Sequence, residues 1–157
     1  MTFLSVAIIL LNFIFKDYRP IMENNNNNNN NTTDNKAQIK RISAIQLRVG
    51  LDAEKVPVYM DWHAEDSPDT PEPIEAKAFM LSIFDKQYRD TFKIDLWTQE
   101  LQVNEMDRFM FETLRSLADT YERATVNKEM ANHMRAFAQY FGEKTKILAS
   151  PDGEAEA

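Results

Sequence analysis

The spacing of apolar residues changes once along the chain, and this change constrains the fold more than any other feature. From residue 42 to residue 97, apolar and polar side chains alternate in short segments, the period of two that is typical of half-buried strands. From Asn104 onward, apolar positions recur three or four residues apart, which is the period of amphipathic helices. Strands followed by helices indicate the α+β class with an antiparallel sheet.

Four segments carry the strand pattern, and they cover residues 42–51, 58–64, 76–84 and 92–97. The third segment is apolar on both faces, which favours a central strand that is covered from both sides. It is joined to the fourth segment by a polar stretch that is typical of a hairpin turn. Residues 65–75 hold three prolines and five acidic residues, so we interpret this whole connection as an exposed loop.

Two amphipathic helices follow, the first capped by Asn104 and the second by Asn127. Gly142 is expected to weaken the second helix near its end. Because each helix carries one apolar stripe, the prediction is an α+β fold: a four-stranded antiparallel sheet followed by two C-terminal helices packed on one face. The stripes consist of Met106, Phe109, Met110, Leu114, Leu117, Ala118 and Tyr121, and of Met130, Met134, Phe137, Ala138 and Phe141.

The first 21 residues differ in composition from the rest. Their apolar run, residues 2–15, is shorter than a spanning helix requires, and no basic region precedes it as in a secretory signal. We interpret residues 1–21 as an apolar leader translated upstream of the true start at Met22. The alternative is an uncleaved anchor that holds the protein at the inner membrane through residues 2–15.

Two polar segments flank the predicted fold. Residues 22–41 include eight consecutive Asn and are predicted to be a disordered tail, because such a tract cannot bury apolar area. Residues 149–157 are predicted to be a disordered acidic tail. A single α+β domain over residues 42–148 is left between them.

The composition excludes several classes of site. The chain has no Cys, three Gly and a formal net charge of −7. Without Cys it has no disulfide, no Cys-ligated metal and no thiol nucleophile, and with three scattered Gly it has no glycine-rich phosphate loop. The acidic balance argues against nucleic acid as a partner. We expect no cofactor and no enzymatic activity.

Asp61, His63 and Glu65 form the strongest polar cluster. On one strand they would project from the same face, where they could hold a metal ion. Any polar outer strand face gives the same spacing, and we favour that interpretation. A metal-dependent enzyme built on these three residues is the weakest alternative. Asp95 is expected to point outward and to pair with a cation on a neighbouring strand.

Aromatic residues are the more informative feature for function. Phe111 and Tyr140 lie off the main stripes of the two helices, which predicts that they are exposed, and Trp97 ends the fourth strand segment. Aromatic side chains are enriched at protein interfaces. We therefore name Phe111, Tyr140 and Trp97 as candidate partner-binding residues, with no catalytic, cofactor-binding or metal residues. The alternative is that the stripes are wide, or that the helices pack on each other.

Five segments, in order and with matching spacing, resemble the gliding motility-associated protein GldC family of the Bacteroidota. The resemblance covers about residues 42–148. It implies a small accessory protein of bacterial gliding motility without an assigned enzymatic activity, and it implies no catalytic residues. Family members generally begin near the position of Met22. The segments are GLDAEKVPVYMDW (50–62), EAKAFMLSIFD (75–85), IDLWTQEL (94–101), EMDRFMFETLRSLADTYER (105–123) and HMRAFAQYFGEKTK (133–146).

Resemblance and residue chemistry together predict a cytoplasmic protein that acts through protein–protein interaction. Its expected partners are protein components of the gliding or associated secretion machinery, with no nucleic acid, and with a membrane only if residues 2–15 are an anchor. Self-association stays open. The alternative is a SecB-like holdase or export chaperone, because four strands and then two helices match that chaperone's element order, and tetramers are then expected.

Overall fold

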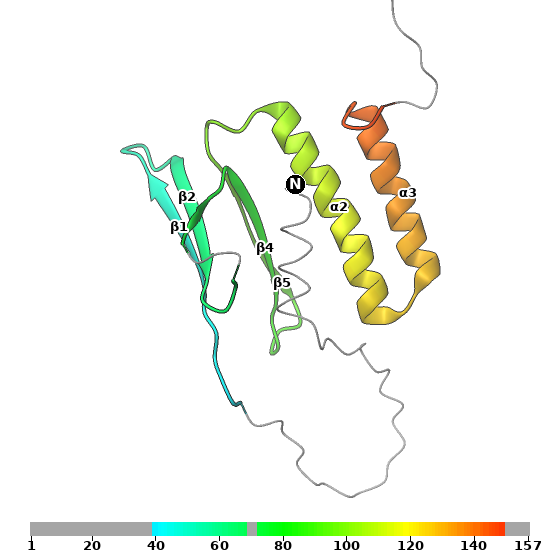
Figure 1. Ribbon diagram of the computed structural model, residues 1–157, viewed down its shortest axis with the longest axis horizontal. Helices are drawn as coiled ribbons and strands as arrows, with labels where there is room; N and C mark the ends of the chain where they lie inside the picture. Colours follow the sequence, from blue (N-terminus) through cyan, green and yellow to red (C-terminus); the bar gives the residue numbers. More distant parts are fainter. Residues whose placement is uncertain (1–38, 69–71, 150–157) are drawn as a thin grey trace, which may run out of the picture. The chain divides into compact units, whose positions relative to one another are not determined.

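The computed structural model describes residues 39–68 and 72–149 (Figure 1). They fall into two compact units that meet in the sequence between Ala76 and Lys77. The first unit is a small sheet, and the second holds a strand hairpin followed by two helices. The predicted α+β class, with antiparallel strands and two C-terminal helices, is confirmed.

The predicted leader over residues 1–21 lies outside the described residues, as do most of the predicted tails over 22–41 and 149–157. One domain over residues 42–148 stays a prediction. Within the described ranges, no helix is both long and apolar enough to cross a membrane.

The sheet of the first unit is built on the pairing of β1 (Ile45–Leu51) with β2 (Pro57–Ala64). The two strands are antiparallel, and their register shifts between Gly50 and Leu51. In the connection between them, the Asp52 carboxylate accepts the N–H of Val56 at 2.8 Å. Pro57 begins its strand, as expected of a residue that cannot donate a ladder hydrogen bond.

The predicted single four-stranded sheet is wrong. The described strands form a three-stranded sheet in the order β1-β2-β3 and a separate two-stranded sheet of β4 and β5. The reason lies in the proline-rich connection, since its end is not loop but the short strand β3 (Ile74–Glu75). β3 pairs with β2 at Trp62 and Asp61, and the Ala76 N–H donates to the Met60 carbonyl at 2.9 Å. This edge of β2 is therefore occupied.

The second unit begins with the hairpin of β4 (Ala78–Phe84) and β5 (Thr91–Trp97), paired in unbroken antiparallel register. The predicted turn is confirmed, since the Asp85 carboxylate accepts the N–H of Tyr88 at 2.6 Å. The prediction that β4 is central and covered on both sides is wrong. Its one strand partner among the described residues is β5, and Ile83 is exposed.

The two helices, α2 (Val103–Thr125) and α3 (Lys128–Lys144), lie antiparallel and side by side (Figure 1). α2 begins before the predicted cap, because Gln102 takes the N-cap position and its N–H donates to Glu105 at 3.0 Å. At α3 the predicted cap is confirmed, since the Asn127 side chain accepts the N–H of Met130 at 3.0 Å. Packing of both helices on one sheet face stays a prediction.

The contact between α2 and α3 buries mainly small residues, together with the ring of Phe111. Ala131, Ala138 and Gly142 are the buried residues of α3, and Phe111 and Ala118 those of α2. A Cβ atom on Gly142 would lie 2.8 Å from the Phe111 ring, so this ring fills the space that the glycine leaves open. The close approach of the helices therefore depends on residues without large side chains.

Candidate interaction surface

The three predicted partner-binding residues differ in exposure. Phe111 is only 4% exposed, so its predicted exposure is wrong. Its position off the main stripe of α2 reflects the contact with α3, where the ring lies against Gly142. Tyr140 is 55% exposed and Trp97 is 53% exposed. Their role in binding a partner stays a prediction.

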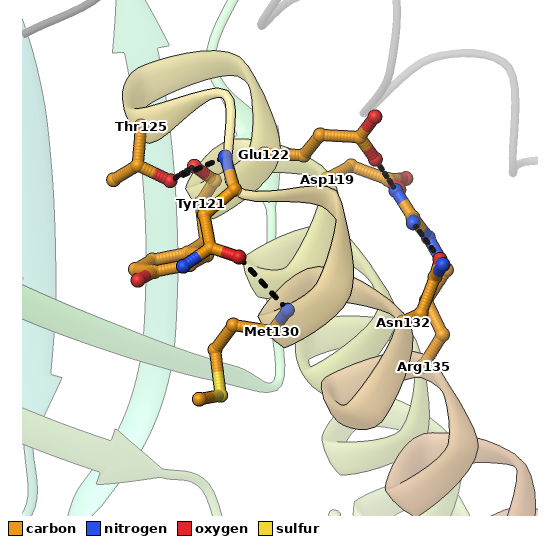
Figure 2. A network of polar contacts seen from close by, with 8 residues as sticks. Asp119, Tyr121, Glu122, Thr125, Met130, Asn132 and Arg135 are labelled. Atoms are coloured by element: carbon orange, nitrogen blue, oxygen red, sulfur yellow. Dashed lines mark hydrogen bonds and ion pairs between the residues drawn. The ribbon is translucent and has the colours of Figure 1, made fainter.

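One flank of the helix pair is polar and centres on Arg135 of α3. Its Nη2 atom lies 2.8 Å from the Asp119 carboxylate and 2.5 Å from the Glu122 carboxylate, both on α2. Nη1 donates to the Asn132 side chain at 3.0 Å (Figure 2). The hydrogen bonds to Asp119 and then to Glu122 raise the pKa of Arg135. This bridge fixes how the two helices are placed along each other.

The opposite flank of the same helix pair is apolar. At 100° per residue, Phe137 and Met130 lie to one side of the buried Ala138, and Arg135 lies to the other. On α2, Leu117 lies to one side of Ala118 and Glu122 to the other. In an antiparallel pair these apolar sides face the same way. We call the apolar flank the set Met106, Met110, Leu114, Leu117, Tyr121, Met130, Met134, Phe137 and Phe141.

The predicted burial of the α3 stripe is only partly correct. Ala138 is fully buried, whereas Met130 and Phe137 are exposed, as is Leu117 on α2. Because small residues make the helix contact, the large apolar side chains of the flank are left beside it. Large exposed apolar groups that gather on one face are typical of surfaces that bind proteins.

Tyr140 extends the aromatic end of this flank. Its ring centroid lies 6.4 Å from that of Phe137, and the two planes are tilted by 33°. The Lys144 Nζ lies 5.7 Å from the centroid of Tyr140, within the range of a cation–π contact. Two neighbouring aromatic rings beside a cation present a surface suited to apolar and carboxylate groups together.

The strand hairpin has an apolar face of its own. In the register of β4 and β5, Phe79 lies opposite Leu96, and alternate pairs along the hairpin share its face. Ile83, Phe92 and Ile94 on this face are exposed. The other face mixes polar and apolar residues. We call the apolar hairpin face the set Phe79, Leu81, Ile83, Phe92, Ile94 and Leu96.

Sequence reasoning recognised the alternation in the β5 segment but described the β4 segment as apolar on both faces. It did not predict that Phe79, Leu81 and Ile83 share one face with Phe92, Ile94 and Leu96. The turn between the two strands carries the information that sets their register. Because Asp85 and Asp90 bracket it and the Asp85 N–H donates to the Asp90 carbonyl at 2.8 Å, the turn alone fixes which residues of the two strands face each other.

Asp61, the first residue of the predicted polar cluster, forms hydrogen bonds with residues outside that cluster. It is 2% exposed, and its carboxylate accepts Arg48 Nε at 2.7 Å and the Tyr59 hydroxyl at 2.6 Å. The register places Arg48 directly across from it on β1. These hydrogen bonds, first from Arg48 and then from Tyr59, lower the pKa of Asp61. The same bond to Asp61, together with burial, raises the pKa of Tyr59.

The structure does not join the other two residues of the cluster to Asp61 as a ligand set. The Glu65 carboxylate accepts the Ala44 N–H at 3.3 Å, and His63 Nδ1 is buried without a hydrogen-bond partner. Within residues 39–68 and 72–149, no group of three His, Asp or Glu side chains is placed to hold a metal ion. The geometry gives the metal-dependent alternative no support. Sequence reasoning missed Arg48 and Tyr59 because the partner of a buried charge depends on strand register.

Comparison with known proteins gives one family. A family model described as "Gliding motility-associated protein GldC-like" matches residues 57–147, which is more than half of the chain. The matched range includes the apolar hairpin face and the apolar flank. No curated protein and no solved structure matches the chain.

Proposed function

Because the chain belongs to the GldC-like family of gliding motility-associated proteins, we propose that it is a non-enzymatic accessory protein of the bacterial gliding apparatus. In this proposal it acts in the cytoplasm and binds protein components of the gliding or associated secretion machinery. The supporting observation is the apolar flank with its aromatic end, where Phe137 and Tyr140 stay exposed beside a helix contact made of small residues.

The exposed rings are large enough to matter energetically. A fully buried aromatic side chain removes about 150–250 Å² from water, so a half-exposed ring has on the order of 100 Å² left to bury. At about 25 cal/mol per Å², each ring contributes about 2 kcal/mol to a complex that covers it. Two such rings account for a difference of about 1,000-fold in affinity before ordering costs are counted.

A partner of matching chemistry is an amphipathic helix or an apolar segment that carries a carboxylate. Its apolar side chains would cover Phe137 and Met130, and its carboxylate would lie near Lys144. This partner uses a face of the helix pair that the Arg135 bridge leaves open, because that bridge occupies the opposite flank.

The test is a pull-down of the tagged full chain from gliding cells, with mass spectrometry of the recovered proteins. The variant Phe137→Ser with Tyr140→Ser should lose the motility or secretion components that the wild type recovers. Val126→Ser is the control, since it also removes an exposed apolar side chain but lies at the connection between α2 and α3, outside the apolar flank. Recovery of no such component by the wild type, or equal recovery by both variants, would contradict the proposal.

A second candidate function is a SecB-like holdase for export. The observation that favours it is the apolar hairpin face, where exposed Ile83, Phe92 and Ile94 offer a strand-shaped apolar surface for unfolded segments. The wild type should then slow the aggregation of an unfolded client in a light-scattering assay, and Phe92→Ser should weaken this effect. Native mass spectrometry that shows a monomer without bound client would remove this candidate.

A further inference from the structure

The strand β5 has one edge that no described strand occupies. At the two ends of the hairpin, the Thr98 N–H donates to the Lys77 carbonyl and the Asp85 N–H donates to the Asp90 carbonyl, both at 2.8 Å. Hydrogen-bonded pairs alternate along an antiparallel ladder, so the even-numbered residues of β5 bond to β4. The odd-numbered residues, Thr91 to Trp97, therefore point their backbone N–H and C=O groups toward the free edge.

A second copy of β5 fits this edge in one register above all. Two antiparallel copies can bond only where odd-numbered residues face each other. With Ile94 on the two-fold axis, Lys93 faces Asp95 of the second copy, and this pair occurs twice. A shift of two residues in either direction places Lys93 opposite Lys93, or Asp95 opposite Asp95. Opposite charges across strands are favourable and like charges are not, so the strand is self-complementary in this register.

The apolar side chains favour the same register. The two-fold axis stands perpendicular to the sheet, so both copies keep the same residues on the same face. Phe92 then lies opposite Leu96 of the second copy, and Ile94 lies opposite Ile94. The apolar hairpin face becomes continuous across the joint, and Phe92 and Ile94, which are exposed in one copy, gain apolar neighbours.

We propose that the chain forms a homodimer by antiparallel pairing of β5 with β5 of a second copy, centred on Ile94. The pairing joins the two hairpins into one sheet, and Lys93 and Asp95 set its register. The proposed function does not require this dimer, because the apolar flank lies on the helices.

The charges on β5 differ from the usual protection of an edge strand. Proteins guard exposed edges with charged residues, Lys above all, that repel a second strand. Edge charges of a single sign would repel a second copy of the strand in every register. Lys93 and Asp95 instead oppose the two shifted registers and favour the central one, which is the pattern of a specific joint.

The first experiment is a charge exchange on the full chain, measured by sedimentation equilibrium from about 1 µM to about 1 mM. Lys93→Asp, which places like charges opposite each other twice, should raise the dimer dissociation constant by about 10-fold or more. The double variant Lys93→Asp with Asp95→Lys restores both attractive pairs and should dimerise like the wild type. Lys86→Asp in the turn changes the net charge equally and should have no effect.

The second experiment uses the absence of Cys from the chain. Ile94→Cys places two thiols across a non-hydrogen-bonded pair on the two-fold axis, where the Cα atoms are about 4.5 Å apart, within reach of a disulfide. Phe92→Cys lies on the same face, but its two copies would be about 13 Å apart along the joint. Mild oxidation should therefore give a covalent dimer for the first variant and not for the second.

These results decide the proposal in both directions. A wild type that stays monomeric throughout the concentration range overturns it, and so does equal cross-linking at positions 92 and 94. A dimer that the double exchange fails to restore also overturns it. Circular dichroism of each variant shows that loss of the dimer is not loss of the fold.

Discussion

Gly142→Ala tests the packing between α2 and α3 by setting two opposing effects against each other. In an exposed helix position, replacing Gly by Ala stabilises a protein by about 1 kcal/mol. Here the new Cβ would lie 2.8 Å and 2.9 Å from two atoms of the Phe111 ring and 2.9 Å from Leu148 Cδ1. Contacts this short force a neighbour to move.

The sign depends on which neighbour moves. Leu148 follows α3, and its side chain can yield, but the Phe111 ring is buried and its face carries the Arg115 guanidinium at 5.6 Å from the centroid. Overpacking of a fixed core side chain costs about 1–3 kcal/mol. After the helix gain is subtracted, we expect Gly142→Ala to lower the free energy of unfolding by about 1 kcal/mol.

The measurement is urea unfolding of the full chain followed by circular dichroism at the helix band. Ala136→Gly, on the exposed face of α3, calibrates helix propensity and should cost about 1 kcal/mol. In a Phe111→Leu background the ring is gone, so Gly142→Ala should become stabilising by up to about 1 kcal/mol. If Gly142→Ala stabilises the wild type, or if the sign is the same in both backgrounds, the packing argument is refuted.

Three further predictions concern polar contacts. Arg135→Gln should lower the urea midpoint because it removes the bridge between α2 and α3, whereas Arg108→Gln on the exposed face of α2 should not. Asn127→Ala removes the cap of α3 and should cost about 1 kcal/mol in the same assay. The folded-state pKa of Asp61 lies below its usual value near 3.8. The hydrogen bonds to the ionised carboxylate therefore stabilise the fold fully above about pH 4, and this stabilisation is lost as the pH falls further. Asp61→Asn should therefore flatten the acid limb of a stability–pH profile, and an unchanged limb would contradict the assignment.

The helices could be predicted from sequence because their signal is local. Period, polar cap and short connection all lie within the segment that they describe, and the Asn127 cap is confirmed to the residue. The face that each helix buries was harder to predict. Hydrophobicity favoured Met130 and Phe137 over Ala131 and Gly142, but close helix packing selects for small volume, so the smaller residues form the contact.

The sheet could be predicted only in part because pairing is not local. The alternation identified the four longer strands and the turn at Asp85, but two residues of a proline-rich connection are too few to show a period. Those two residues, Ile74 and Glu75, pair with β2. The Arg48 partner of Asp61 was missed for the same reason, since it follows from the register of β1 with β2.

The sparse core connects these observations to function. Among the described residues, the fully buried side chains of large volume are Met60 and Asp61, and both lie on β2. The helix contact buries mainly alanines and a glycine, and large apolar groups of the second unit such as Phe92, Leu117 and Phe137 stay exposed. Exposed apolar area of this extent weakens a monomer and rewards association, because burying it contributes about 25 cal/mol per Å². A second copy would cover part of that area at the β5 edge, and a different protein would cover another part at the apolar flank. Since these two surfaces lie on different elements, Lys93→Asp should weaken dimerisation without loss of the recovered components. Phe137→Ser with Tyr140→Ser should lose those components and leave dimerisation unchanged.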